Sequence, residues 1–286
     1  MFDFLKNKRE TVDEIDPELA EKLKEAAKAH IENNEPKKAE KLYMRSFAIY
    51  KKLMADKPEL YKEHTAKCCE GIGNTYENLE KYNDAYEYYM MAADLYKDLA
   101  ISNNPDYKEM LSDTYGNIGD TLFFRNKYDE AEKYYMLSLE MYFELVKLDQ
   151  NKYLEDVAYC YDCLAKVSSA KEEYSASIEN YEKVIEIYKK LIADNEVIES
   201  EEILDYNDGL ATAFGDIGYI YSCCKNFEDA EKYYLKAAEI YYELAKVDSY
   251  EYADSLAEQY EDLSTLYEDM EKPELAKEYK RRAKNV

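Results

Sequence analysis

The stretch KYDEAEKYYMLSLEMYFEL, residues 127–145, returns 99 residues later in nearly the same form as NFEDAEKYYLKAAEIYYEL, residues 226–244. Both stretches are rich in helix-forming residues, and both place Ala and Tyr where a helical period keeps them on one face. The recurrence of one amphipathic helix sequence within a chain is typical of repeat proteins. The spacing of the copies therefore decides the fold.

Two sequence markers give the length of the repeat. The first marker opens the quoted helix and lies three residues before a small residue; it occurs at Pro36, Tyr82, Tyr128, Tyr174, Phe227 and Pro273. The second marker is a tyrosine that precedes each new repeat: Tyr61, Tyr107, Tyr153, Tyr206 and Tyr252. Both markers recur every 46 residues, with one shared interval of 53 residues. The exception indicates a seven-residue insertion near residues 195–202.

Each repeat contains the pattern of two helices. We number a repeat so that the small residue of its second helix is position 20: Ala39, Ala85, Ala131, Ser177, Ala230 and Ala276. Position 24 is usually a tyrosine: Tyr43, Tyr89, Tyr135, Tyr181 and Tyr234, with Lys280 in the last repeat. Position 8, in the first helix, is small: Ala27, Gly73, Gly119, Ala165, Gly218 and Ser264. Glycine costs about 1 kcal/mol against alanine inside a helix, so its recurrence predicts that two backbones approach closely there.

The prolines fit the same helix boundaries. Pro17 follows Asp16, a good N-cap, and Pro36 and Pro273 open second helices, where the first turn tolerates proline. Pro58 and Pro105 fall between repeats. No proline therefore interrupts a predicted helix.

The first helices now carry a family resemblance. The run YGNIG at residues 115–119, with Ala131 and Tyr135 after it, resembles the tetratricopeptide repeat, as do FGDIGYIY at 214–221 and CEGIGNTY at 69–76. The resemblance covers residues 17–284, although the period of 46 residues exceeds the usual value of about 34. It implies an all-α, right-handed α-solenoid of six antiparallel helical hairpins, with the first helices lining a concave surface.

We expect the following domain organisation. Residues 1–15 form an N-terminal arm, and residues 16–286 form a single solenoid domain. The last second helix is short and basic, as suits a solvent-facing cap. The approximate boundaries of the six repeats are 17–61, 62–107, 108–153, 154–206, 207–252 and 253–286.

Composition restricts the class of partner. The formal net charge of −25 disfavours nucleic acid and anionic membranes and favours basic partners. No apolar run approaches the roughly 18 residues that a membrane span needs, and MFDFLK has too few apolar residues for stable anchoring. The six cysteines include two adjacent pairs, which do not suggest a disulfide framework. A reduced, cytoplasmic setting is the expectation.

Catalytic patterns are weak. The two histidines, His30 and His64, have no partners in a recognised spacing, and no phosphate-binding loop or nucleophile elbow occurs. Cys160 and Cys163 form a C-Y-D-C run, but it lies within a predicted helix and lacks two further zinc ligands nearby. We expect no enzyme activity, no metal and no cofactor.

A binding surface is the remaining feature. On a helical wheel, positions 2, 5, 9, 12 and 13 of each first helix lie opposite the packed face, and position 6 lies at the edge. In this family that opposite face lines the groove. Glycine at position 5, Gly116 and Gly215, would admit a close peptide backbone or is a tolerated surface glycine. The predicted groove residues are Glu70, Asn74, Asp113, Asn117, Asp120, Phe123, Tyr159, Asp162, Lys166, Asp216 and Tyr219.

The character of these residues argues for one kind of ligand. A family mode that grips a C-terminal carboxylate is rejected, because Asn74 and Asn117 match it but Glu70, Tyr159 and Cys163 do not. The acidic and aromatic side chains instead predict a scaffold that binds a peptide or an extended protein segment with Lys or Arg beside apolar anchors. The alternative is a structural solenoid that associates with itself to form a homo-oligomer.

Overall fold

The computed structural model describes residues 16–102, 104–194 and 200–286, and every regular element in these ranges is an α-helix. The chain divides into two compact units, Met1–Ser138 and Leu139–Val286, each described by itself below. The predicted arm at 1–15 and most of the predicted insertion near 195–202 lie outside the described residues. The prediction of a single solenoid domain stays a prediction.

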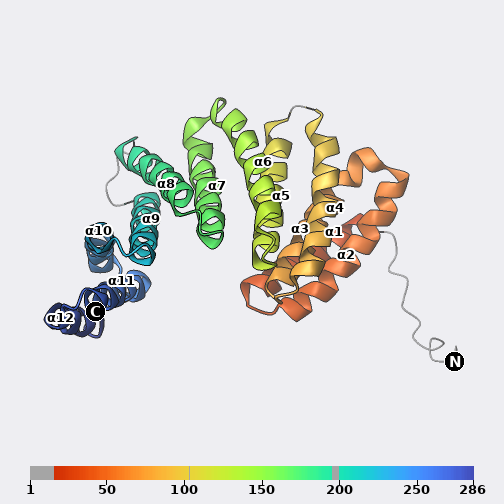
Figure 1. Ribbon diagram of the computed structural model, residues 1–286. Coiled ribbons are helices and arrows are strands. Elements are labelled where there is room, and N and C mark those ends of the chain that lie inside the picture. Colours follow the sequence, from red (N-terminus) through yellow and green to blue (C-terminus); the bar gives the residue numbers. More distant parts are fainter. Residues whose placement is uncertain (1–15, 103, 195–199) are drawn as a thin grey trace, which may run out of the picture. The chain divides into compact units, whose positions relative to one another are not determined.

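The first unit consists of helices that pack against their neighbours in the chain. From α1 to α5 each helix contacts the next, so that the hairpins α1–α2 and α3–α4 stand side by side and α5 follows α4 (Figure 1). The helices are α1 (Pro17–Glu32), α2 (Pro36–Asp56), α3 (Pro58–Glu77), α4 (Tyr82–Ala100), α5 (Pro105–Phe124) and the first part of α6 (Tyr128–Val146). The predicted pairing of helices is confirmed.

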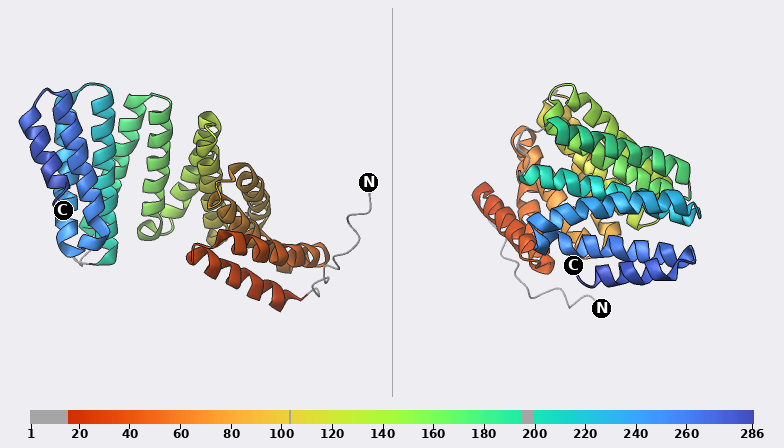
Figure 2. Two further views of the ribbon diagram at one scale, coloured as in Figure 1. Left: turned by 90° about the horizontal axis from the view of Figure 1, so that it is seen from below. Right: turned by 90° about the vertical axis from the view of Figure 1, so that its left-hand side faces the viewer.

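The second unit repeats this arrangement. From α7 to α12 each helix packs against the next, and the left view of Figure 2 shows α9 in teal and α10 to α12 in blue as antiparallel neighbours. The helices after α6 are α7 (Gln150–Ala170), α8 (Tyr174–Asp194), α9 (Glu201–Cys223), α10 (Phe227–Val247), α11 (Ser249–Asp269) and α12 (Pro273–Ala283). Helix α12 has 11 residues and ends on basic side chains, as predicted.

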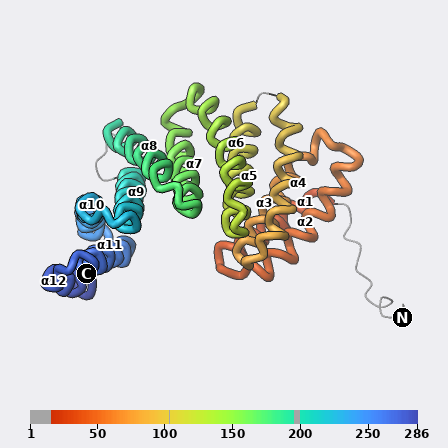
Figure 3. Tube along the Cα trace, viewed as in Figure 1, coloured from red at the N-terminus to blue at the C-terminus, as the bar shows by residue number. Residues whose placement is uncertain are grey.

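The turn inside each hairpin has the same backbone conformation. Figure 3 traces the chain through these turns. Repeat position 15 is left-handed in all six hairpins, with φ between 56° and 60°: Asn34, Glu80, Asn126, Glu172, Lys225 and Glu271. The following N–H then bonds back to the preceding helix, as Lys81 N does to Tyr76 O at 2.8 Å. This bond is typical of a Schellman motif, which ends a helix and reverses the chain.

The helix starts follow the local sequence. All five prolines occupy the first turn of a helix, where no backbone donor is lost. The Asp16 carboxylate accepts a 2.9 Å bond from Glu18 N, and Asn104 Oδ1 accepts a 3.1 Å bond from Asp106 N. The predicted helix starts at Pro17, Pro36 and Pro273 and the predicted Asp16 cap are therefore confirmed. Pro58 and Pro105 were predicted to fall between repeats, but they open α3 and α5.

The repeated glycine of position 8 lies beneath a tyrosine ring. A Cβ added to Gly73 would lie 2.5 Å from the Tyr89 ring, and a Cβ at Gly119 would lie 2.5 Å from the Tyr135 ring. The sequence predicted a close approach at this position but attributed it to two backbones. The structure corrects the cause, since the nearest atoms belong to the position 24 tyrosine of the same hairpin.

Candidate functional site

Each unit has its own candidate site, the first-helix face, which we define as repeat positions 2, 5, 6, 9 and 12. These positions lie on α1, α3 and α5 in the first unit and on α7, α9 and α11 in the second. Position 9 is mostly exposed, as Asn74 and Tyr219 show, whereas most residues at positions 5 and 6 are buried or half-buried, as Glu70 and Asp216 show. Polar groups at positions 5 and 6 must therefore find partners inside the fold.

Two rows of core tyrosines on the second helices extend toward this face. The row at position 24 is the one that the sequence showed. A second row at position 31, always seven residues later, was missed although the Tyr-x6-Tyr spacing is visible in the sequence: Tyr50, Tyr96, Tyr142, Tyr188 and Tyr241. A buried tyrosine needs a partner for its hydroxyl. The structure supplies acidic partners for several of them on the first helices.

Glu70 is the most enclosed of these partners in the first unit. The Tyr96 hydroxyl donates to Glu70 Oε2 at 2.6 Å, and Thr114 Oγ1 donates to Glu70 Oε1 at 2.8 Å. Burial raises the pKa of Glu70 to about 7, and Asp113 adds to this, although the two hydrogen bonds act in the opposite direction. Three helices, α3, α4 and α5, thus meet at one carboxylate.

A second group in the first unit surrounds the hydroxyl of Tyr89. This hydroxyl lies 2.5 Å from Asn74 Oδ1 and 2.7 Å from Glu77 Oε2. Burial raises the pKa of Glu77 to about 7, and the neighbouring carboxylate of Asp120 raises it further. Asp120 Oδ1 in turn accepts a 2.7 Å bond from Tyr135. The structure therefore brings Asn74 and Asp120 of the predicted set into one acidic, tyrosine-supported area.

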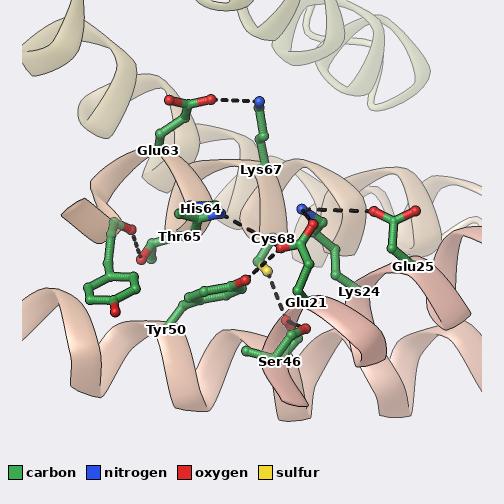
Figure 4. A network of polar contacts seen from close by, with 12 residues as sticks. Glu21, Lys24, Glu25, Ser46, Tyr50, Glu63, His64, Thr65, Lys67 and Cys68 are labelled. Atoms are coloured by element: carbon green, nitrogen blue, oxygen red, sulfur yellow. Dashed lines mark hydrogen bonds and ion pairs between the residues drawn. The ribbon is translucent and has the colours of Figure 1, made fainter. Parts of the chain in front are cut away.

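The first hairpin shows the same construction (Figure 4). The Tyr50 hydroxyl donates to Glu21 Oε2 at 2.6 Å, and the His64 ring stacks on Tyr50 with 5.0 Å between the ring centroids. Beneath them, Ser46 Oγ donates to Ala20 O at 2.7 Å. His64 therefore has an aromatic and an acidic neighbour that its sequence context did not reveal.

The second unit gathers Asp162, Lys166 and Asp216 of the predicted set. Lys166 Nζ donates to Asp162 Oδ2 at 2.6 Å, and the pKa of Lys166, which burial lowers, is raised overall by Asp162 and Asp216. Burial raises the pKa of Asp216 to about 6; Asp162 adds to this, and Lys166 and Tyr181 oppose it. These three residues form a charge cluster on α7 and α9, in which Asp162 and Asp216 are half-buried and Lys166 is exposed.

A pocket of about 510 Å³ continues this face of the second unit between α9 and α11. Asp216 and Tyr219 of the predicted set lie in its wall, together with Asp208, Glu258, Gln259 and Asp262. Gly215 also belongs to the wall, but the space beside it is occupied, since an added Cβ would lie 2.9 Å from Gln259 Oε1. Gln259, Glu258 and Asp262 were not predicted.

The remaining predicted residues are Asp113, which neighbours Glu70, and Asn117, Phe123 and Tyr159. Phe123 is near the end of α5 and packs its ring against Phe124 and Tyr128 at the hairpin turn. Asn117 is half-buried on α5, and Asp113 and Tyr159 are exposed on α5 and α7. The structure therefore places Phe123 at the edge of the face rather than among the acids.

Other chemistry-bearing groups take ordinary positions. Cys160 and Cys163 are buried on α7, and His30 Nδ1 lies 2.7 Å from Glu35 Oε2. Within the described ranges, no three His, Cys, Asp or Glu side chains converge as metal ligands would. None of the described helices combines the length and the apolar character that crossing a membrane requires.

Comparison with known proteins identifies the repeat. Two family models, both described as tetratricopeptide repeat, match this chain, one at residues 66–99 and 112–144 and the other at residues 157–195 and 210–249. Together these segments make up about half of the chain. No curated protein sequence matches it.

Solved structures match the fold at low identity. BtubC (BKLC) from P. vanneervenii is 16% identical with a TM-score of 0.64, and the match covers 85% of this chain and 87% of that one. The apo form of RapI is 17% identical with a TM-score of 0.62, covering 96% and 86%. The apo form of the quorum sensor NprR from B. thuringiensis is 14% identical with a TM-score of 0.63, covering 93% and 64%. At these identities the likeness concerns the fold alone.

Proposed function

Because the chain belongs to the tetratricopeptide repeat family, we propose that it is a protein-interaction scaffold whose first-helix faces bind a basic segment of a partner protein. Proteins of this family bind protein partners, and stacked hairpins offer an extended surface for an extended ligand. The proposed role is binding rather than catalysis, since the fold is typically non-catalytic and function has to be argued from the site.

The observation that carries the proposal is the electrostatic state of the first-helix faces. The pKa values of Glu70 and Glu77 are raised to about 7, and those of Asp216 and Asp262 to about 6, with burial as the largest cause in each case. Neighbouring carboxylates add to the effect in all four. A cation supplied by a partner would stabilise the ionised form of each group.

The long-range field supports the same partner. A net charge of −25 attracts basic segments and speeds their association, and it repels acidic ones. Such attraction is screened by salt. Binding through the first-helix faces should therefore weaken as the ionic strength rises.

The experiment uses an array of short peptides that combine Lys or Arg with Leu or Phe, paired with the same peptides carrying Glu in place of each basic residue. The full chain should bind the basic member of the pairs. Charge reversal at an exposed position of the face, Asp113→Lys in the first unit or Glu258→Lys in the second, should reduce this binding. Equal binding of both members of the pairs would refute the proposal.

The choice of variants follows from the structure. Asp120 and Asp216 are unsuitable for reversal, because Asp120 accepts a bond from Tyr135 and Asp216 is half-buried, so a lysine there would disturb the core. The matched controls change the net charge equally on exposed positions of second helices. They are Glu87→Lys in the first unit and Glu239→Lys in the second.

A second candidate function, self-association into a homo-oligomer, draws on the exposed apolar side chains of α6 and α10. Met136 in the first unit is 53% exposed, and Tyr242 in the second unit is 49% exposed. Size-exclusion chromatography with light scattering over a wide concentration range separates the candidates. The scaffold proposal predicts a monomer at every concentration, whereas self-association predicts a mass that rises with concentration.

A further inference from the structure

The pocket between α9 and α11 has a composition that selects a particular ligand group. Its acidic wall residues are Asp208 and Asp216 on α9 and Glu258 and Asp262 on α11. We propose that this pocket binds the guanidinium group of an arginine in the partner segment. The inference rests on the proposed function, because it assigns the place in the second unit where a basic side chain of the partner is held.

The carboxylates of the pocket are close enough to repel one another. Burial raises the pKa of Asp262 to about 6, and Glu258, Glu261 and Asp216 raise it further. Asp162 and Glu258 likewise raise the pKa of Asp216, and Lys166 offsets part of this rise. A cation placed among Asp216, Glu258 and Asp262 would relieve this repulsion.

A neutral group in the wall points to a ligand independently of the acids. Gln259 is only 8% exposed, yet its Oε1 atom has no hydrogen-bond partner. This oxygen lies beside Gly215, also in the pocket wall. Asp216 Oδ2 is likewise buried without a hydrogen-bond partner. Buried acceptors are normally satisfied, so two unsatisfied acceptors in one pocket indicate a place for donors from a ligand.

The arrangement favours arginine over lysine. The acceptors come from two helices, and a guanidinium presents five N–H donors in a planar fork, whereas an ammonium presents three around a single point. Tyr219, which is 57% exposed in the same wall, offers a ring face on which a guanidinium can stack. A charged and planar donor group with an aromatic neighbour thus matches the pocket.

The test titrates the full chain with N-acetyl-arginine amide and, separately, with N-acetyl-lysine amide and N-acetyl-citrulline amide, followed by ligand-observed NMR and calorimetry. Citrulline keeps the shape of arginine but has no charge. We expect arginine to bind, citrulline not to bind, and lysine to bind about tenfold more weakly because it satisfies fewer acceptors. Equal binding of arginine and lysine would overturn the assignment.

Two pocket variants and one control locate the binding. Gln259→Met removes the unsatisfied acceptor at similar length, and Asp262→Asn removes a charge at constant shape. Asp254→Asn changes the charge at an exposed position of the same helix outside the pocket. Thermal unfolding confirms that each variant is folded. Both pocket variants should weaken arginine binding about tenfold while D254N has no effect; an equal effect of all three, or none, would overturn the assignment.

The experiments distinguish a failure of the arginine-pocket proposal from a failure of the scaffold proposal. If a basic peptide from the array binds the wild type and Q259M with equal affinity, the arginine pocket is wrong and the scaffold proposal stands. If N-acetyl-arginine amide binds in the pocket but no basic peptide binds the chain, the pocket stands and the scaffold proposal is wrong.

Discussion

The hydroxyl of Tyr96, whose ring is fully buried on α4, donates a 2.6 Å hydrogen bond to Oε2 of Glu70 on α3. Glu70 is thus both a residue of the first-helix face and the partner of a core tyrosine. The same relationship links Tyr50 to Glu21 and Tyr135 to Asp120. The first-helix face and the core are therefore coupled through single hydrogen bonds, which makes the stability of the fold sensitive to the protonation state of these acids.

The first prediction concerns the pH dependence of stability. The folded-state pKa of Glu70, about 7, lies above its ordinary value of 4.5. The stability that this group contributes is therefore fully present below about pH 4.5 and is lost as the pH rises through about 7. Glu70→Gln should be more stable than the wild type at about pH 8, by up to about 3 kcal/mol, with a smaller difference at about pH 5.5. Urea unfolding at both pH values measures the difference.

Glu63→Gln is the matched control on the same helix. Hydrogen bonding to Lys67 is the largest cause that holds the pKa of Glu63 below its ordinary value. Its contribution is present above the ordinary pKa and is lost as the pH falls, so E63Q should show no gain at high pH. A uniform effect of E70Q at both pH values would contradict the account.

The second prediction concerns the tyrosine hydroxyls. Tyr89→Phe removes the donor that faces Asn74 and Glu77 and leaves buried acceptors without it. The free energy of unfolding should fall by about 1–3 kcal/mol. Tyr250, which is 98% exposed, provides the control, and Tyr250→Phe should change nothing measurable. Chemical denaturation compares the two variants, and equal stability of Y89F and the wild type would show that the hydroxyl row has no structural role.

The third prediction concerns the glycines of the first helices. Gly119→Ala should destabilise the fold by about 1–3 kcal/mol despite the better helix propensity of alanine, because the new Cβ would meet the rigid Tyr135 ring. Gly215→Ala should cost less, since the nearest atoms are the flexible end of Gln259. Thermal unfolding ranks the two variants, and a stabilised G119A would contradict the packing described here.

The fourth prediction concerns the hairpin turns. Lys225 adopts φ 58° at the end of α9, a conformation that favours glycine. Lys225→Gly should raise the free energy of unfolding by about 0.5–1 kcal/mol because it removes this strain. Ser222→Gly, within α9 itself, should instead lower it by about 0.5 kcal/mol, since serine is the better helix former. Denaturant unfolding of both variants checks the sign, and a loss of stability in K225G would show that the turn is unstrained.

Much of the fold could be predicted because the pattern of two helices recurs in six repeats of the sequence. Pro36 and Pro273 mark helix starts at the same register, and Tyr89 and Tyr135 mark the same packed position, so each feature supports the others. The close approach at Gly119 was also predictable, since glycine is costly in a helix. What occupies the space beside Gly119 was not predictable, because a sequence pattern does not distinguish a backbone from a ring.

The candidate site could be predicted less well. Helical periodicity locates a face, and Asp120 and Asp216 do lie on it, but periodicity does not show which carboxylate a tyrosine hydroxyl reaches. Tyr96 lies 26 residues from Glu70, and the bond between them depends on how α3 and α4 pack. Gln259 was missed because it stands out only through a buried oxygen without a hydrogen-bond partner, and the sequence does not show which side-chain atoms are buried.

The most direct measurement of the central claim maps where a bound basic segment lies. A photoreactive phenylalanine analogue replaces Asp113 or Glu258 on the first-helix faces, or Glu87 or Glu239 on the second helices, and the tightest basic peptide from the array is added before illumination. The account predicts crosslinks to the peptide from position 113 or position 258 and none from positions 87 and 239. Crosslinks from the second-helix positions alone would contradict it.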